Sequence, residues 1–162
     1  MKKLLFVLPF LLFACKTSIN PKNQSFYCKI NGQEFIPEKD NSPIGGVGSS
    51  PLKISRDTQN GWFSIYSWNT PIFIGLTLKV PTNATLEIKD YILGSDLKES
   101  KAYFTNNSTL PVSDYLISSS GKITITKIEG TKFWGTFEFK TKDTKTNQEY
   151  VVSEGQLNNL SF

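Results

Sequence analysis

The chain has 162 residues, and its 18 Lys and Arg stand against 14 Asp and Glu, which gives a formal net charge of +4. It contains no histidine, which excludes Ser-His-Asp and Cys-His nucleophile activation and most zinc and copper sites, so we expect neither a metal site nor another cofactor. The charges are nearly balanced and scattered along the chain, so they give no argument for a nucleic-acid partner.

The N-terminal segment predicts export and lipid attachment. Lys2 and Lys3 form a positive start, and residues 4–14 carry no charge, which is typical of the apolar part of a signal peptide and too short to span a bilayer. Leu12-Phe13-Ala14-Cys15 resembles a bacterial lipobox, with an aliphatic residue three before the cysteine and a small residue directly before it. This resemblance implies that residues 1–14 are removed, that the Cys15 thiol receives diacylglycerol, and that Cys15 anchors the protein in a membrane.

The residues after Cys15 indicate a location. Lys16 stands in place of the Asp that is associated with inner-membrane retention, which favours the outer membrane, and no acidic run typical of surface export follows. We therefore expect a lipid-anchored protein on the periplasmic face of the outer membrane. Residues 15–24 are polar and lack periodicity, so they predict a flexible tether before a single β domain over residues 25–162.

Strands and tight turns are predicted for the body of the domain. Asn31-Gly32 is a hairpin signal, and the Gly-, Pro- and Ser-rich residues 38–51 predict an irregular loop. One helical turn is expected over residues 95–101, where Asp96 and Glu99 have the spacing of a capping box. The expected strands cover residues 25–31, 33–36, 52–56, 62–68, 72–80, 86–93, 101–105, 114–118, 122–129, 132–142 and 149–162.

Alternation within these strands indicates which faces are buried. Apolar residues at every second position of 72–80 share one face, and Phe133, Phe137 and Phe139 share one face of 132–142. Short strands separated by turn signals predict an all-β fold. We expect an antiparallel sandwich or flattened barrel of about eight to ten strands.

Short motifs at both ends of the domain carry a family resemblance. They are Phe-x-x-x-Ile-Asn-Gly-x-x-Phe within residues 26–35, then residues 121–126, 135–139 and 154–157. These motifs resemble small lipoproteins of unknown function that are common in Bacteroidota. The resemblance implies a β domain in the cell envelope and transfers no catalytic residues.

Cys28 is the second cysteine of the chain. Alternation places it on one strand face with Phe26 and Ile30, and free cysteine packs as a small apolar residue. We therefore expect a buried, unreactive thiol at Cys28. The alternative is a reactive thiol that pairs with another molecule.

Large aromatic residues gather in one strand. Alternation over residues 62–68 places Trp62, Tyr66 and Trp68 on one face and Phe63 and Ile65 on the other. The first hypothesis is that the face with the two tryptophans belongs to the core. The second is that Trp62, Tyr66 and Trp68 form a flat platform for sugar rings or for a protein partner.

The expected function is that of a non-enzymatic cell-envelope lipoprotein that binds a protein, glycan or small ligand, or serves structurally. One alternative is an inhibitor or accessory subunit of an envelope complex. Another is a glycan hydrolase that works with two carboxylates, because a pair of Asp or Glu residues suffices for that reaction.

Overall fold

A computed structural model describes residues 20–38, 50–96 and 98–162. The predicted signal peptide, Cys15 and most of the loop expected over 38–51 lie outside the described residues. Within them the fold is all-β, as the sequence predicts, with ten strands and two short 3₁₀ helices. The elements are η1 (Pro21–Asn23), β1 (Phe26–Ile30), β2 (Gln33–Phe35), β3 (Leu52–Asp57), β4 (Trp62–Asn69), β5 (Ile72–Lys79), β6 (Asp90–Ile92), β7 (Lys101–Thr105), η2 (Val112–Asp114), β8 (Leu116–Glu129), β9 (Lys132–Lys142) and β10 (Glu149–Ser161).

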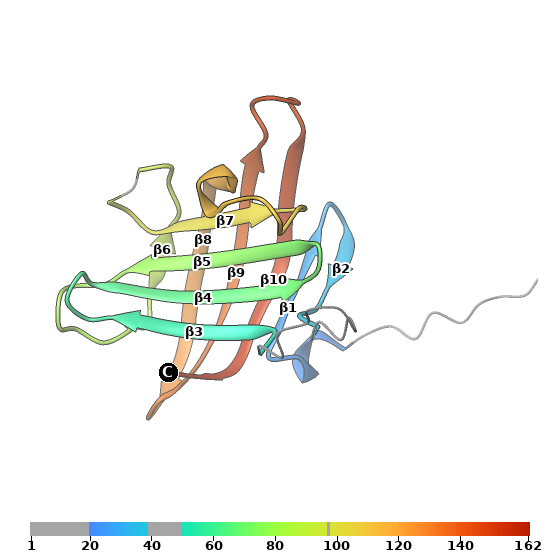
Figure 1. Cartoon of the computed structure of the whole chain (residues 1–162). Coiled ribbons are helices and arrows are strands. Elements are labelled where there is room, and N and C mark those ends of the chain that lie inside the picture. Colours follow the sequence, from blue (N-terminus) through green and yellow to red (C-terminus); the bar gives the residue numbers. More distant parts are fainter. Residues whose placement is uncertain (1–19, 39–49, 97) are drawn as a thin grey trace, which may run out of the picture.

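The strands form one antiparallel sheet in the order β2-β1-β10-β9-β8-β7-β5-β4-β3, and β6 pairs with β8 beside this path. The sheet curls into a half-barrel, which confirms the predicted flattened barrel. In Figure 1 the front layer, formed by β3, β4, β5 and β7, crosses over the back layer, formed by β8, β9, β10 and β1. Because the layers are parts of one sheet, each strand has one face toward the core and one face outward.

Strand β8 joins the two layers. Its first residues pair with β7, and from Ser118 onward it pairs with β9. The register with β9 shifts between Ser118 and Ser120, and Gly121 follows with φ +146°. A Cβ atom at Gly121 would collide with the carbonyl oxygen of Glu138, so only glycine lets the two strands lie this close.

The core lies between the two layers. Ile74, Leu76 and Leu78 of β5 are fully buried, which confirms the face predicted from their alternation. Phe63 of β4 meets Phe133 of β9 with ring centroids 5.4 Å apart in an edge-on arrangement, so the layers contact through aromatic side chains.

Two local predictions are wrong. Among the described residues between 95 and 100 there is no helix: the Asp96 carboxylate accepts the Lys98 N–H (2.8 Å) and the Asp96 carbonyl oxygen accepts the Glu99 N–H (3.2 Å), which closes one turn before β7 begins. The strands expected over 114–118 and 122–129 are one strand, β8, because pairing with β9 continues through the intervening Ser and Gly residues.

The N-terminal end of the described chain contacts the domain. Asn158 of β10 donates its Nδ2 to the carbonyl oxygens of Pro21 (3.2 Å) and Gln24 (2.8 Å), so residues of η1 pack beside the sheet. Cys28 is fully buried, which confirms the predicted burial, and burial raises its pKa; its lack of reactivity stays a prediction. The described part of the chain contains no helix that is both long and apolar enough to cross a membrane.

Candidate functional site

The register of the front layer arranges the outward side chains in rows that run across the strands. Alternation alone places Trp62, Ser64, Tyr66 and Trp68 on one face of β4, and the pairing adds their neighbours from β3, β5 and β7. The rows are Asp57–Trp62–Lys79, then Ser55–Ser64–Thr77–Lys101, then Lys53–Tyr66–Gly75–Tyr103, and finally Trp68–Phe73–Thr105.

These rows enclose an open groove of about 700 Å³ on the outer face of the front layer. This is the face turned toward the viewer in Figure 1. We call it the aromatic groove and define it by Trp62, Tyr66, Trp68, Phe73, Lys101 and Tyr103.

Aromatic rings that pack against one another form one end of the aromatic groove. Phe73 lies 5.5 Å from Trp68, 6.0 Å from Tyr66 and 5.0 Å from Tyr115, measured between ring centroids. A Cβ atom at Gly75 would lie 3.0 Å from the Phe73 ring, so the missing side chain gives Phe73 room to lie on the sheet. Phe73 is buried by its neighbours, and Tyr66 and Trp68 are left half-buried at the surface.

Positive charge marks the other end. The Lys79 Nζ lies 4.3 Å from the centroid of the Trp62 ring and donates to the Asn60 carbonyl oxygen (2.7 Å). The Lys101 Nζ lies 5.1 Å from the same centroid. Burial lowers the pKa of Lys101, and the negative charge of Asp96 opposes this shift.

The floor between the two ends is polar. The hydroxyl groups of Ser64 and Thr77 are 3.2 Å apart and share a hydrogen bond, and both residues are buried. Asp57 lies at the rim, where it accepts hydrogen bonds from the Asn60 side chain (2.8 Å) and backbone N–H (3.0 Å). These hydrogen bonds lower the pKa of Asp57, so its carboxylate is ionised at neutral pH.

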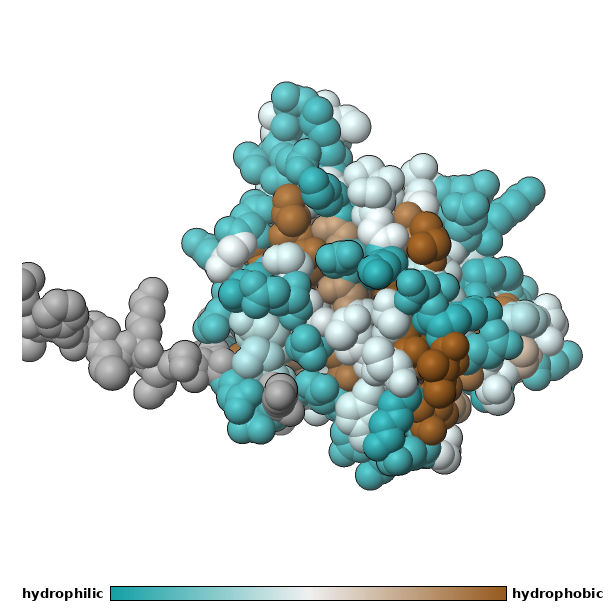
Figure 2. All heavy atoms as spheres, turned by 180° about the vertical axis from the view of Figure 1, so that it is seen from behind, coloured by the Kyte–Doolittle hydropathy of each residue, from teal (hydrophilic) through white to brown (hydrophobic). Residues whose placement is uncertain are grey.

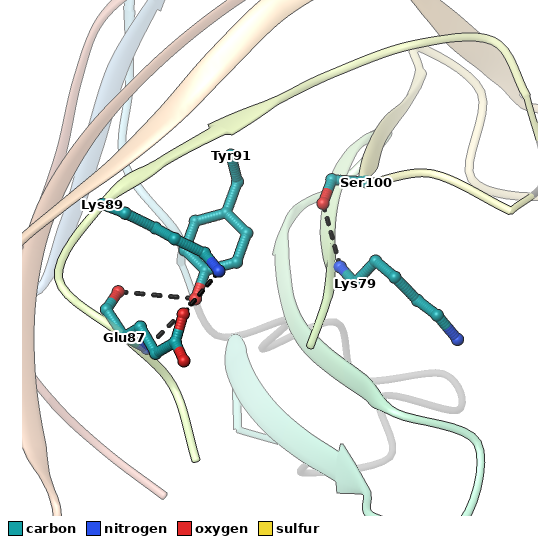
Figure 3. Close-up of polar contacts among 5 residues, drawn as sticks. All are labelled: Lys79, Glu87, Lys89, Tyr91 and Ser100. Atoms are coloured by element: carbon teal, nitrogen blue, oxygen red, sulfur yellow. Dashed lines mark hydrogen bonds and ion pairs between the residues drawn. The ribbon is translucent and has the colours of Figure 1, made fainter. Parts of the chain in front are cut away.

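The connection from β5 to β7 places Lys101 beside the groove. Figure 3 shows the Ser100 hydroxyl accepting the backbone N–H of Lys79 (2.9 Å), which joins the end of β5 to the start of β7. Further back in this connection, the buried Tyr91 hydroxyl accepts the Glu87 N–H (3.0 Å), and Glu87 forms an ion pair with Lys89. Burial raises the pKa of Tyr91, so the phenol stays neutral and holds the loop against the core.

The structure brings the three residues of the predicted platform together. Trp62, Tyr66 and Trp68 are half-buried on the outer face, and Phe63 and Ile65 are buried in the core. The hypothesis that the face with the tryptophans belongs to the core is therefore wrong, because the opposite face of β4 packs against the back layer. Whether the platform binds a ligand stays a prediction.

Sequence analysis missed the residues that other strands bring to the groove. Lys53, Lys101 and Tyr103 come from β3 and β7, which flank the β4–β5 pair. Alternation in 101–105 places Lys101 and Tyr103 on the same face, but it does not say which strand lies beside them. That information is in the pairing register alone.

The outer face of the back layer differs from the groove. Figure 2 shows the face opposite to that of Figure 1, and it is mostly hydrophilic with separate apolar spots. It carries Trp134 of β9, with the Lys127 Nζ 4.6 Å from the ring centroid, and Lys127 forms an ion pair with Glu129 (2.8 Å). Among the residues that the structure describes, no three or more Cys, Asp or Glu side chains lie close enough together to hold a metal ion.

Comparison with known protein families gives one match. Residues 54–161 match the family described as Domain of unknown function (DUF6252). The chain belongs to this family. The matched segment runs from β3 to the end of β10 and includes every residue that defines the aromatic groove. No curated protein matches the chain, and no solved structure does.

Proposed function

We propose that this member of the DUF6252 family is a cell-envelope lipoprotein that binds a saccharide in the aromatic groove and does not transform it. The observation that carries the proposal is that Trp62, Tyr66 and Trp68 lie half-buried on the outer face of β4, outside the core. Rings of this size are normally buried, so a set of them at a concave surface supports a binding role.

A saccharide fits the chemistry of the groove. The C–H groups on one side of a pyranose ring form a flat apolar face, which packs on an aromatic ring, and its hydroxyl groups project from the edge. The hydroxyls of Ser64, Tyr66, Thr77 and Tyr103 lie on the same outward face and offer hydrogen-bond partners. Trp62 and Trp68 are six positions apart on β4, a separation of about 20 Å, which suits several linked sugar rings.

The carboxylates near the groove support binding without hydrolysis. Hydrolysis of a glycosidic bond usually needs two carboxyl groups that face each other across the bond, one of them protonated. Among the described residues that line the groove, Asp57 is the single acid, and its hydrogen bonds with Asn60 favour the ionised form. Asp57 stabilises the turn to Asn60 through its hydrogen bonds. A single ionised carboxylate cannot act both as the proton donor and as the second carboxylate of the reaction.

The location forms the second part of the proposal. The lipobox-like segment that ends in Cys15 supports lipid attachment, and Lys16 supports the periplasmic face of the outer membrane. Asn20, the first described residue, is five positions after Cys15, and five residue steps span at most about 18 Å. The domain would therefore stay close to the lipid surface.

Two experiments test the two parts separately. For the anchor, radiolabelled palmitate should enter the wild-type protein and not the Cys15→Ser variant; equal labelling of both would contradict lipid attachment at Cys15.

For the groove, tryptophan emission of the full chain should change on titration with a panel of neutral and acidic oligosaccharides. The double variant Trp62→Ala/Trp68→Ala should lose the binding, and Trp134→Ala on the back layer should keep it.

The groove experiment also has outcomes that would contradict the proposal. Binding that survives the loss of Trp62 and Trp68 would place the ligand elsewhere. A stoichiometric protein partner in a crosslinked pull-down, together with no saccharide binding, would favour the inhibitor or accessory-subunit alternative.

A further inference from the structure

We propose that the saccharide is acidic and that one of its carboxylates binds at the Trp62 end of the aromatic groove, between Lys79 and Lys101. The inference rests on the proposed function and adds the substrate class and the orientation of the ligand. It is carried by the distribution of charge around the groove and by a comparison of two lysine–tryptophan pairs.

Cations outnumber acids around the groove. Lys53 and Lys101 line it and Lys79 lies over Trp62, whereas the acids are Asp57 in the lining and Asp96, which acts on Lys101. The whole chain also carries an excess of cations, with 18 Lys and Arg against 14 Asp and Glu. A concave surface with an excess of one sign of charge raises the local concentration of ligands of the opposite sign.

The pair of Lys79 and Trp62 differs from its counterpart on the back layer. Lys127 lies over Trp134 at a similar distance, but Glu129 neutralises its ammonium group in an ion pair. Lys79 donates to a backbone carbonyl oxygen instead and forms no ion pair with a described carboxylate. The carbonyl satisfies one N–H of Lys79, and the negative charge of Asp57 acts on the ammonium group through space without forming an ion pair with it.

Asp57 lies in the same row as Trp62 and Lys79, yet it is turned to other partners. Its two carboxylate oxygens accept hydrogen bonds from the Asn60 backbone and side chain. The turn at residues 57–60 therefore uses the acid that the register places in the row of Trp62 and Lys79. A carboxylate supplied by the ligand would contact Lys79 directly, whereas Asp57 acts on Lys79 only at a distance.

Lys101 gives the site its depth. The residue is 5% exposed, and its Nζ lies 5.1 Å from the centroid of Trp62 and 6.0 Å from that of Tyr103. The negative charge of Asp96 acts on this lysine, and a charge on a buried side chain interacts more strongly with a nearby anion than one in water. A sugar ring that packs on Trp62 would bring its carboxylate to this position.

The aromatic end of the groove determines which way round the saccharide binds. Tyr66, Trp68 and Phe73 lie beyond the Ser64–Thr77 floor, and the single nearby cation in their rows is Lys53 on the edge strand β3. We therefore expect sugar rings to pack along Tyr66 and Trp68, and the acidic ring to occupy the Trp62 end.

The experiment compares each acidic saccharide with its own uncharged form. The full chain, purified in detergent, is titrated with oligomers of galacturonate, of mannuronate and of hyaluronan, and with the methyl ester of each. Esterification removes the charge and keeps the ring. We expect at least one acid to bind about tenfold more tightly than its ester at low salt, and the difference to shrink at ~0.5 M NaCl, where exposed charges are screened.

Lysine variants locate the effect. Lys79→Gln and Lys101→Gln should each weaken binding of the acid several-fold and leave binding of the ester unchanged. Lys127→Gln on the back layer is the matched control and should change neither. Lys79 is exposed, so its variant tests the inference even where Lys101→Gln fails to fold.

Each further outcome decides between the two proposals. Equal affinity for acids and esters, abolished by Trp62→Ala/Trp68→Ala, would overturn the acidic ligand and leave the proposed function intact. The same sensitivity to Lys127→Gln as to Lys79→Gln would also overturn the inference, because it would mean that charge acts at a distance and not at the Trp62 end. No binding of any acid, ester or neutral oligosaccharide would overturn both.

Discussion

The outer faces of the two layers share their construction and differ in content. Both carry a half-buried tryptophan with a lysine over its ring, Trp62 with Lys79 in front and Trp134 with Lys127 behind. In the back layer Glu129 neutralises the lysine, and the surface around it is mostly hydrophilic (Figure 2). In the front layer further rings and lysines gather around the tryptophan, and together they form a groove.

The difference teaches that the aromatic groove is not a consequence of the fold. The inner faces of both layers supply the core, and alternation requires nothing particular of the outer faces except solubility. The back layer meets that requirement with polar side chains between its buried positions. The front layer instead exposes Tyr66 and Trp68, which a domain with a complete core does not need, and this surplus is the reason to assign binding to the groove.

The largest expected effect tests which face of β4 holds the fold together. Phe63→Ala should lower the free energy of unfolding by about 3–5 kcal/mol, because Phe63 is 1% exposed and packs on Phe133 across the layers. Trp62→Ala, one position away and outward, should lower it by no more than about 1 kcal/mol. Chemical denaturation of both variants measures these changes. A larger fall in the free energy of unfolding for Trp62→Ala would mean that the side chains of the outer face belong to the core.

The next effect concerns the strand that the two layers share. Gly121→Ala should destabilise the domain by about 3 kcal/mol, because a Cβ atom would meet the Glu138 carbonyl and the Phe139 backbone. Gly130→Ala is the matched control. Gly130 also has positive φ (61°) but no atom within 4 Å of the added Cβ, so about 1 kcal/mol is expected. Thermal unfolding of both measures the difference, and equal losses would mean that contact with β9 at Gly121 contributes nothing.

A smaller effect depends on the thiol on the inner face of β1. Burial raises the pKa of Cys28, so the folded state keeps a proton that the unfolded chain releases near its ordinary pKa of 9.0. The resulting stability is complete below pH 9.0 and is lost as the pH rises further, by at most about 1.4 kcal/mol per pH unit. Denaturation at alkaline pH should show this slope in the wild type, and Cys28→Ala should remove it. An identical slope in both would contradict a buried neutral thiol.

The smallest effect is a change in affinity with pH in the groove. Burial lowers the pKa of Lys101, and Asp96 opposes this shift; the other titratable groups of the groove and its rim are Lys53, Asp57, Tyr66, Lys79 and Tyr103. Lys101 should therefore lose its charge at a lower pH than an exposed lysine, and affinity for an acidic saccharide should fall several-fold on the alkaline side. The fall should be absent for the methyl ester and for Lys101→Gln. A parallel fall for the ester would point to a change in the fold.

The sequence predicts the strands of this protein better than their arrangement. Alternation in 62–68 correctly places Phe63 and Ile65 on one face and Trp62 and Trp68 on the other, because successive side chains of a strand point to opposite faces of the sheet. It does not decide which face is buried when both are apolar, and it does not show that β7 lies beside β5. Lys101 and Tyr103 are 39 and more residues away from Trp62 in the chain, so they join the groove only through long-range pairing.

The break expected near Gly121 shows a related limit. Ser119, Ser120 and Gly121 have the composition of a turn, and sequence analysis ends one strand before them and begins another after them. In the structure Gly121 pairs with Phe139, because pairing along β9 outweighs the local preference of three small residues. The same glycine then allows the close contact where β8 passes between the layers.

The three tryptophans give the most direct test of the central claim, that a ligand lies in the aromatic groove. Trp62 and Trp68 belong to the groove and Trp134 to the back layer, so their indole N–H resonances report on the two outer faces in one spectrum. On titration of the full chain with the tightest-binding oligosaccharide, we predict that the Trp62 and Trp68 resonances shift together and saturate, and that Trp134 does not move. A shift of Trp134 with Trp62 and Trp68 unchanged would place the ligand on the other face and contradict the account.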